Sequence, residues 1–203
     1  MLGDSAPGSL KREIQHRPPT WGAFTLYLGV SAQVFPPEFP SHHQVIGNPY
    51  QALGEGNSIF MSLSEPEDQS RAPYGFRTVT LSTHTRVQEW WKLAHSDPDG
   101  YAAWKEDYTN RVFALAEQIL PGIKSAARLV LPGTPLTFAF YTRRPQGMVG
   151  GFPQTSLLSA RGPQTGLSNL WLVGDSIFPG QSTAGVTLGA LRVVAEMLRQ
   201  SPA

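Results

Sequence analysis

The last part of the sequence contains the residues whose types and order could bind a ligand. A short apolar run at residues 169–173 ends in Gly174-Asp175, and a loop of small residues and an amphipathic segment reaching about residue 200 follow. The pattern predicts a buried, often parallel, strand, then a loop and a helix. This order places backbone N–H groups and the positive helix end where they stabilise an anion or an electron-rich ligand edge. Asp175 could accept hydrogen bonds from ligand hydroxyls, and a capped turn without a ligand is the alternative.

The predicted C-terminal helix has an apolar and a charged side. Apolar or small side chains recur at helical spacing and predict the inward stripe: Val186, Ala190, Val193 and Met197. Arg192, Glu196 and Arg199 lie on the outward side at spacings of three and four, where they support the helix as ion pairs.

Other groups that support chemistry are weak or absent in the sequence. His42, His43 and His84 lack the spacing and the carboxylate companions of a metal site, so solvated or capping histidines are the better interpretation. Ser176 follows Gly-Asp and does not stand in a Gly-x-Ser-x-Gly motif, so a hydrolase nucleophile has no support. With no cysteine, the chain has no disulfide, thiolate metal site or cysteine nucleophile. We therefore expect no metal and identify no catalytic residue.

The composition indicates a folded chain that handles apolar surface. Only 15% of the 203 residues are charged, against about 25% in an average globular chain. The net charge is +1 and no Lys/Arg-rich run occurs, which argues against nucleic acid as a partner. The apolar, charge-free residues 21–37 are interrupted by Gly and Pro and do not resemble a membrane span. Residues 1–20 are polar, without a signal-peptide core, and predict a tail or linker and a cytoplasmic start, unless Met1 is not the natural first residue.

The middle of the chain predicts a small sheet followed by helices. Residues 21–30, 58–63 and 77–83 are strand candidates and together suggest a small mixed or antiparallel sheet. Residues 87–94 form one helix candidate, and Asp97-Pro98 begins another that ends at Pro121-Gly122. Residues 136–141 could be a helix or a strand, and residues 147–151 form a glycine-rich loop.

An aromatic stripe marks one face of the long helix that follows Asp97-Pro98. Its members recur at spacings of three and four: Tyr101, Trp104, Tyr108, Val112, Leu115 and Ile119. Such a stripe packs into a core or lines a ligand cavity, and core packing is the simpler interpretation.

The C-terminal motif resembles the flavin-binding motif of the FAD-dependent carotenoid oxidoreductases. This family contains the phytoene desaturases, the carotene cis-trans isomerases and the carotenoid 3',4'-desaturases. The matching residues run from Leu170 through Gly174-Asp175-Ser176 to Pro179-Gly180 and Thr183-Ala184-Gly185-Val186. Residues 21–30, 71–73 and 144–151 resemble segments of the cyanobacterial type of 3',4'-desaturase. The resemblance covers roughly residues 18–200.

The resemblance implies FAD as cofactor and a carotenoid as substrate. It implies that Asp175 bonds the ribityl–pyrophosphate region of FAD, that residues 183–186 lie against the isoalloxazine ring, and that the 147–151 loop lies near the flavin or the substrate channel. The implied cofactor-binding residues are Gly174, Asp175, Pro179, Gly180, Thr183, Ala184, Gly185 and Val186. A water-insoluble substrate further implies peripheral contact with a membrane.

The chain departs from the family pattern at its beginning. The family opens with a βαβ unit carrying Gly-x-Gly-x-x-Gly, which this sequence lacks, and its members are more than twice as long. We therefore expect an α/β fragment: residues 1–20 a tail, 21–165 part of a substrate-binding domain, and 166–203 the final strand, loop and helix of a Rossmann-like FAD-binding domain.

Three functions follow from this reading. The first is the C-terminal portion of a desaturase that passes hydride from a polyene C–H to FAD and is inactive alone. A carotene cis-trans isomerase and a non-catalytic fragment that binds an apolar ligand or partner are the alternatives.

Overall fold

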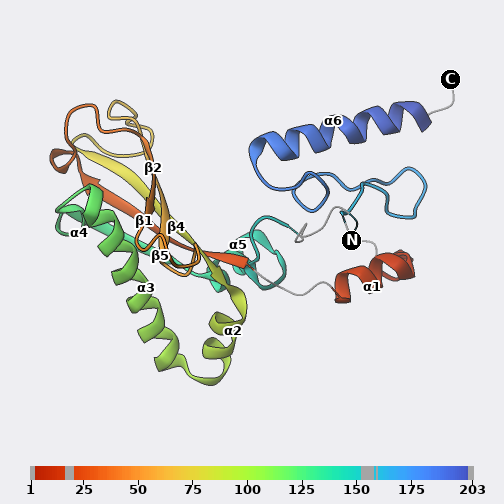
Figure 1. The fold of residues 1–203 in the computed structure, drawn as a ribbon, viewed down its shortest axis with the longest axis horizontal. Helices are drawn as coiled ribbons and strands as arrows, with labels where there is room; N and C mark the ends of the chain where they lie inside the picture. Colours follow the sequence, from red (N-terminus) through yellow and green to blue (C-terminus); the bar gives the residue numbers. More distant parts are fainter. Residues whose placement is uncertain (1–2, 17–20, 152–157, 159, 201–203) are drawn as a thin grey trace. The chain divides into compact units, whose positions relative to one another are not determined.

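A computed structural model describes residues 3–16, 21–151, 158 and 160–200. By its internal contacts the chain divides into two compact units (Figure 1). One unit comprises Trp21–Met148, and the other comprises the described residues of Met1–Thr20 and Val149–Ala203. We call them the sheet unit and the terminal unit and describe each by itself.

The sheet unit is built on five antiparallel strands. They are β1 (Trp21–Ser31), β2 (His42–Ile46), β3 (Ser58–Leu63), β4 (Phe76–Arg86) and β5 (Ala127–Gly133), in the spatial order β2-β3-β4-β1-β5. Every strand pair is antiparallel. The predicted antiparallel sheet and its strands β1, β3 and β4 are therefore confirmed, whereas β2 and β5 were not predicted.

Helices cover one face of this sheet. Helix α2 (Val87–Ser96) and helix α3 (Pro98–Ile119) confirm the two predicted helices, and the short helix α4 (Ile123–Ala126) follows. Asp97 caps α3, because its carboxylate accepts a hydrogen bond from the Gly100 N–H at 2.9 Å. Alternate residues of β1, from Phe24 to Val30, point into the core under these helices.

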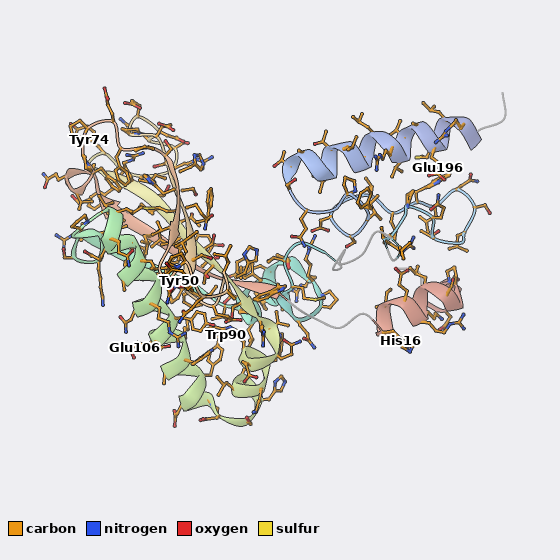
Figure 2. All side chains as sticks on the ribbon, in the orientation of Figure 1. His16, Tyr50, Tyr74, Trp90, Glu106 and Glu196 are labelled. Atoms are coloured by element: carbon orange, nitrogen blue, oxygen red, sulfur yellow. The ribbon has the colours of Figure 1, made fainter. Side chains whose placement is uncertain are left out.

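The aromatic stripe of α3 packs into this core, as the simpler interpretation predicted. Phe24 stacks on Trp90 with ring centroids 5.6 Å apart, and it lies 5.2 Å from the ring of Tyr108. Trp90, labelled in Figure 2, is fully buried. The Tyr108 hydroxyl donates to the Glu55 carboxylate, and Thr85 Oγ1 lies 3.1 Å from the same hydroxyl. These bonds tie α3 to β4 and to the loop that carries Glu55, and the side chains of Tyr108 and Thr85 are buried.

The ambiguous segment at 136–141 is helical. Helix α5 (Pro135–Thr142) begins with a capping box between Thr134 and Thr137. A 3-10 turn, η3 (Pro145–Gly147), packs back on α5. Gly147 has φ +70°, and a Cβ there would lie 1.8 Å from the Pro135 carbonyl oxygen, so only glycine fits. The sheet unit has one further 3-10 turn, η2 (Ala32–Val34).

The terminal unit contains η1 (Gly3–Ser5), α1 (Gly8–His16) and α6 (Thr183–Gln200). The C-terminal helix was predicted, but α1 was not foreseen in a segment expected to be a tail. The predicted strand at 169–173 is wrong, because Trp171 makes only an isolated bridge, to Gln164. A buried parallel strand needs neighbours on both sides, and the described part of this unit supplies no strand beside it. The Rossmann-like arrangement is therefore not confirmed.

Across the described ranges, no helix is both long and apolar enough to span a lipid bilayer.

Replacing Tyr108 with Phe tests the buried network. Burial, and next the hydrogen bond to Glu55, raise the pKa of the Tyr108 phenol, whereas tyrosine in an unfolded chain ionises near pH 10. This difference gives stability that is complete below about pH 10 and is lost as the pH rises further. We expect Tyr108→Phe to cost about 1–2 kcal/mol at pH 7. Urea unfolding measures the effect of alkali: above about pH 10, the free energy of unfolding should fall less in Tyr108→Phe than in the wild type.

Tyr74→Phe is the control, because that side chain is 90% exposed. It should leave stability unchanged at pH 7 and in alkali. An identical alkaline loss in the wild type and in Tyr108→Phe would show that the phenol does not carry this effect.

Candidate functional site

The predicted cofactor residues lie together in the terminal unit, between the isolated bridge at Trp171 and the first turn of α6. Gly174 has φ +114°, and a Cβ built there would meet nothing within 4 Å. Asp175 follows it and is half-buried, with the Ser176 hydroxyl 3.5 Å from its carboxylate. The backbone at Gly174 thus borders open space, next to the Asp175 carboxylate in the chain.

The glycine-rich loop lies directly against this turn. A Cβ added to Gly151 would be 2.7 Å from the Asp175 carbonyl oxygen and 2.8 Å from the Ser176 nitrogen. A Cβ on Gly150 would meet the Gln181 side chain at 2.5 Å. At Gly151, where the contact is with backbone, only a residue without a side chain permits this approach. Two segments singled out in the sequence therefore meet in the structure.

Helix α6 begins beside the same loop. Ser182 caps it, because its hydroxyl accepts from the Gly185 N–H at 3.1 Å and its carbonyl accepts from the Val186 N–H at 3.0 Å. Within the part of the chain that the structure describes, the N–H groups of Thr183 and Ala184 have no recorded acceptor. These two exposed residues supply the free donors and the positive helix end that an electron-rich ligand edge requires.

The loop between Asp175 and α6 is fixed by its own packing. Ile177 is buried, and its side chain lies 3.8 Å from the position of a Cβ on Gly189 of α6. Gly180 is buried and Pro179 is half-buried, and the Gly180 carbonyl oxygen would lie 2.6 Å from a Cβ on Gly185. Sequence reasoning placed the other residues of this turn but overlooked Ser182, although serine just before a helix is a common capping signal.

These residues fit one edge of a flavin nucleotide. The glycine contacts leave backbone accessible at Gly174, Asp175 can accept from hydroxyls, and the start of α6 offers N–H donors. Bound FAD would supply reversible acceptance of hydride or of single electrons. The described residues contain no cluster of three His, Cys, Asp or Glu that could hold a metal ion.

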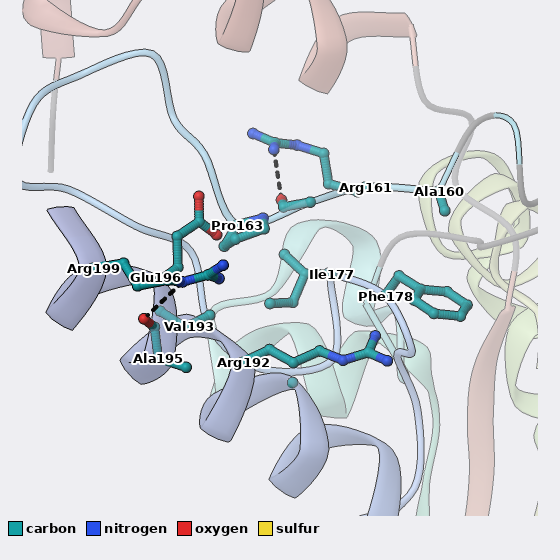
Figure 3. A pocket seen from close by; sticks show the side chains of 12 residues that line it. Ala160, Arg161, Pro163, Ile177, Phe178, Arg192, Val193, Ala195, Glu196 and Arg199 are labelled. Carbon is teal, nitrogen blue, oxygen red and sulfur yellow. Dashed lines mark hydrogen bonds between the residues drawn. The ribbon is translucent and has the colours of Figure 1, made fainter.

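A cavity of about 520 Å³ lies along the other half of α6 (Figure 3). Its arginines are already engaged, because Arg192 lies 5.7 Å from the Phe178 ring and Arg161 pairs with Glu13 at 2.8 Å. Arg199 donates to the Ala195 carbonyl at 3.2 Å, and the carboxylate of Glu196 also lines the space. None of the predicted cofactor residues lines this cavity, which is therefore distinct from the candidate site.

Comparison with known proteins supports the family indicated by the motif. No family model matches the sequence. The chain is 32% identical over 182 residues to a chloroplastic prolycopene isomerase of Arabidopsis thaliana, covering 85% of this chain and 30% of that protein. The corresponding protein of Daucus carota is 31% identical over 85% of this chain and 29% of its own length. Prolycopene isomerase 1 of an Oncidium hybrid cultivar is 30% identical, again over 85% of this chain and 30% of the relative.

These matches fit the carotenoid oxidoreductase family that the motif indicates. Within that family, the relatives that it resembles are prolycopene isomerases. The matched segment spans only 29–30% of the length of the relatives described above.

Gly151→Ala tests the contact between the glycine-rich loop and Asp175. The new Cβ would overlap backbone atoms at a left-handed φ of +67°. Gly166→Ala is the matched control, with φ +84° and only ordinary contacts beyond 3.6 Å. We expect Gly151→Ala to lower the free energy of unfolding by about 1–3 kcal/mol more than Gly166→Ala, because it adds overlap to the same backbone strain. Urea unfolding followed by circular dichroism measures both. Equal losses would mean that the two loops do not touch.

Proposed function

We propose that this chain forms the carotenoid-binding portion and the flavin edge of a flavin-dependent carotenoid-modifying enzyme. In this proposal, residues 21–165 belong to the substrate-binding domain and residues 166–203 to the C-terminal part of the FAD-binding domain. The observation that carries it is the one-sided sheet: helices cover one face, and the opposite face exposes apolar side chains in a chain related to prolycopene isomerases.

The strand register identifies the residues of the open face. Leu131 of β5 pairs with Tyr27 of β1, which pairs with Thr80 of β4, and the same rung continues to Ser62 and His42. Because paired residues point to the same side, these side chains lie in one row. Leu131 is 52% exposed and Tyr27 43% exposed, against 0% for Leu26 on the covered face. We call this surface the open sheet face.

The chemistry of the open sheet face suits a polyene. Leu129 and Phe60 add further exposed apolar surface on neighbouring rungs, and uncharged hydroxyls of Thr78, Thr80 and Ser82 run between them along β4. A carotenoid is long, flat and almost without hydrogen-bonding groups, so it gains affinity chiefly by apolar contact. Five strands at about 4.8 Å spacing give a surface about 20 Å wide, enough for a large part of such a chain.

The terminal unit supplies the proposed flavin contacts. Asp175 would accept from ribityl hydroxyls, and the free N–H groups of Thr183 and Ala184 would stabilise negative charge at the ring edge. Gly174, Pro179, Gly180, Gly185 and Val186 would shape the turn that holds these groups. The chain's own role is to bind and orient the two ligands, since no side chain is assigned as acid or base.

Isomerisation of a carotenoid double bond is the reaction that the comparisons favour, because the relatives described above are prolycopene isomerases. Desaturation is the second candidate, supported by the resemblance of residues 21–30 and 144–151 to a 3',4'-desaturase. Product analysis separates them: an isomerase changes the geometry of the carotenoid at constant mass, whereas a desaturase removes two hydrogens from its substrate. A product two hydrogens lighter than the substrate, formed by the complete flavoprotein, would overturn the isomerase reading.

Peripheral membrane contact is part of the proposal, because carotenoids dissolve in membranes. Helix α5 presents Phe140 and Tyr141, which are 62% and 78% exposed, and the Arg143 guanidinium lies 5.2 Å from the Phe140 ring centroid. Exposed aromatic and basic side chains in one place are typical of contact with a lipid interface.

Leu131→Glu tests the open sheet face. A charge in the middle of the apolar row must be desolvated when a polyene binds, so we expect carotenoid affinity to fall at least about tenfold, or 1.4 kcal/mol. Leu53→Glu is the control, because Leu53 is also exposed, at 61%, but lies outside the sheet. Quenching of tryptophan fluorescence by a carotenoid in detergent gives both affinities. Equal affinity of the two variants would exclude the open sheet face as the binding surface.

Asp175→Ala tests the flavin edge in the complete flavoprotein. Loss of the carboxylate removes the acceptor for ribityl hydroxyls, so we expect FAD to bind about tenfold more weakly or worse. Asp99→Ala, on the exposed start of α3, should bind FAD like the wild type. Flavin fluorescence during titration measures both. Wild-type affinity in Asp175→Ala would remove this residue from the proposed site.

A further inference from the structure

A second cavity lies at the β2 side of the open sheet face, within the sheet unit. Its volume is about 340 Å³, and small-molecule sites in proteins begin at about 300 Å³. Eight of the nine described residues that line it are polar. They are His42, Ser62, Ser64, Glu65, Asp68, Arg71, Thr78 and Thr80, and the ninth is Leu63. We call this cavity the edge pocket.

The edge pocket continues the row of side chains on the open sheet face. His42, Ser62 and Thr80 line the pocket and stand on the same rung as Tyr27 and Leu131. Along this rung the side chains change from polar at β2 to apolar at β5. A ligand that lies across the strands would therefore meet apolar surface at one end and the edge pocket at the other.

The loop after β3 supplies charged groups to the edge pocket, and bonds to neighbours hold them in place. Arg71 Nε lies 3.2 Å from the Asp68 carboxylate. The Ser41 hydroxyl donates to the Glu65 carboxylate at 2.7 Å. A carboxylate has acceptor sites for about four hydrogen bonds, so each of these side chains can still accept from a ligand.

The floor of the edge pocket consists of hydroxyl groups from the strands. Ser62, Thr78 and Thr80 are half-buried. None of their hydroxyls hydrogen-bonds to another residue within the ranges that the structure describes. His42 lies beside them, and its ring stacks on Phe60 with centroids 5.8 Å apart. The pocket thus offers donors and acceptors that a ligand can satisfy.

The number and the charge of these groups indicate the chemistry of the ligand. One hydroxyl takes part in at most about three hydrogen bonds, fewer than the eight polar side chains can make. Two carboxylates face a single guanidinium, so the pocket lacks the excess of positive charge that an anion requires. A sugar or another polyol suits this mixture, because each of its hydroxyls both donates and accepts.

We propose that the edge pocket binds a polyhydroxyl end group, such as a sugar, on a ligand whose apolar chain lies along the open sheet face. The inference rests on the proposed function in one respect, that this apolar chain is a polyene. Glycolipids carry the same kind of head group on a flexible chain. The polyene is favoured because the relatives described above are prolycopene isomerases, and because a flat, rigid chain matches a straight row across five strands.

Tryptophan fluorescence quenching of the full chain by two matched polyenes tests this inference. Crocin carries a disaccharide at each end of its polyene, and crocetin dimethyl ester is the same polyene without sugar. In a detergent free of sugar groups, we expect crocin to bind at least about tenfold more tightly than the ester. Equal affinities would overturn the edge pocket as a sugar site but leave the open sheet face intact. If neither polyene binds, the proposed function fails as well.

Octyl glucoside below its micelle concentration separates the two sources of the head group. It joins a sugar to a saturated chain, so we expect it to compete with crocin at least about tenfold more weakly than unlabelled crocin does. Competition as strong as that of crocin would overturn the polyene as the ligand and assign the pocket to a glycolipid.

Ser62→Ala combined with Asp68→Asn tests the pocket itself. The double variant removes one hydroxyl and one charge, so crocin affinity should fall at least about fivefold while affinity for the ester stays unchanged. Ser82→Ala is the control, because Ser82 lies on the same face of β4 but does not line the pocket. It should preserve both affinities, and circular dichroism should match the wild type throughout. Unchanged crocin affinity in the double variant, or an equal loss for both polyenes, would contradict the inference.

Discussion

The sheet unit depends on the packing of α3 against a single face of the sheet. Phe24, Trp90 and Tyr108 form an aromatic contact at the centre of this layer, and Leu26, Leu81 and Met61 are fully buried around it. The loop that carries Glu55 is tied to the same centre through Thr85 and Tyr108. One helical layer covers only one face of the sheet. The side chains at the alternate strand positions point to the other face, which these helices do not cover.

This asymmetry connects the fold to the proposed chemistry. Exposed apolar side chains on one face, such as Leu131, Tyr27 and Phe60, lower the solubility of an isolated chain, and they are explained if an apolar ligand covers them. The terminal unit differs, because Gly151 and Gly185 let backbone segments approach closely, and the N–H groups of Thr183 and Ala184 begin an exposed helix end. One unit thus offers apolar area, and the other offers hydrogen-bond donors and a carboxylate. A flavoenzyme acting on a polyene requires both.

Local signals explain which parts of the fold could be predicted. Helix α3 was predictable because Asp97-Pro98 begins it and Pro121-Gly122 ends it, and β1 and β4 alternate clearly. Strand β5 was not predictable, because Arg128 and Pro132 interrupt its alternating pattern. Its place at the edge of the sheet also depends on pairing with β1, which lies far earlier in the chain. Helix α1 is anchored by the Glu13–Arg161 ion pair, across 148 positions, which no local pattern reveals.

The candidate site shows the same division. A contiguous motif predicts Gly174-Asp175 and the start of α6. The contact of Gly151 with Asp175 joins segments that are separate in the sequence, so no local pattern predicts it. The predicted strand at 169–173 is wrong although its local pattern is clear. Its apolar composition is typical of a strand with neighbours on both sides, but within the described part of the chain Trp171 makes only an isolated bridge, to Gln164.

Hydroxyl-radical footprinting with and without a carotenoid tests the central claim, that the open sheet face binds the polyene. The account predicts that Tyr27, Leu129 and Leu131 are oxidised in the free chain and protected when a carotenoid is bound. Tyr50 and Tyr74, which are 97% and 90% exposed and lie outside the strands, should be oxidised equally in both states. Unchanged oxidation of Tyr27 and Leu131 on binding would contradict the account and place the carotenoid elsewhere.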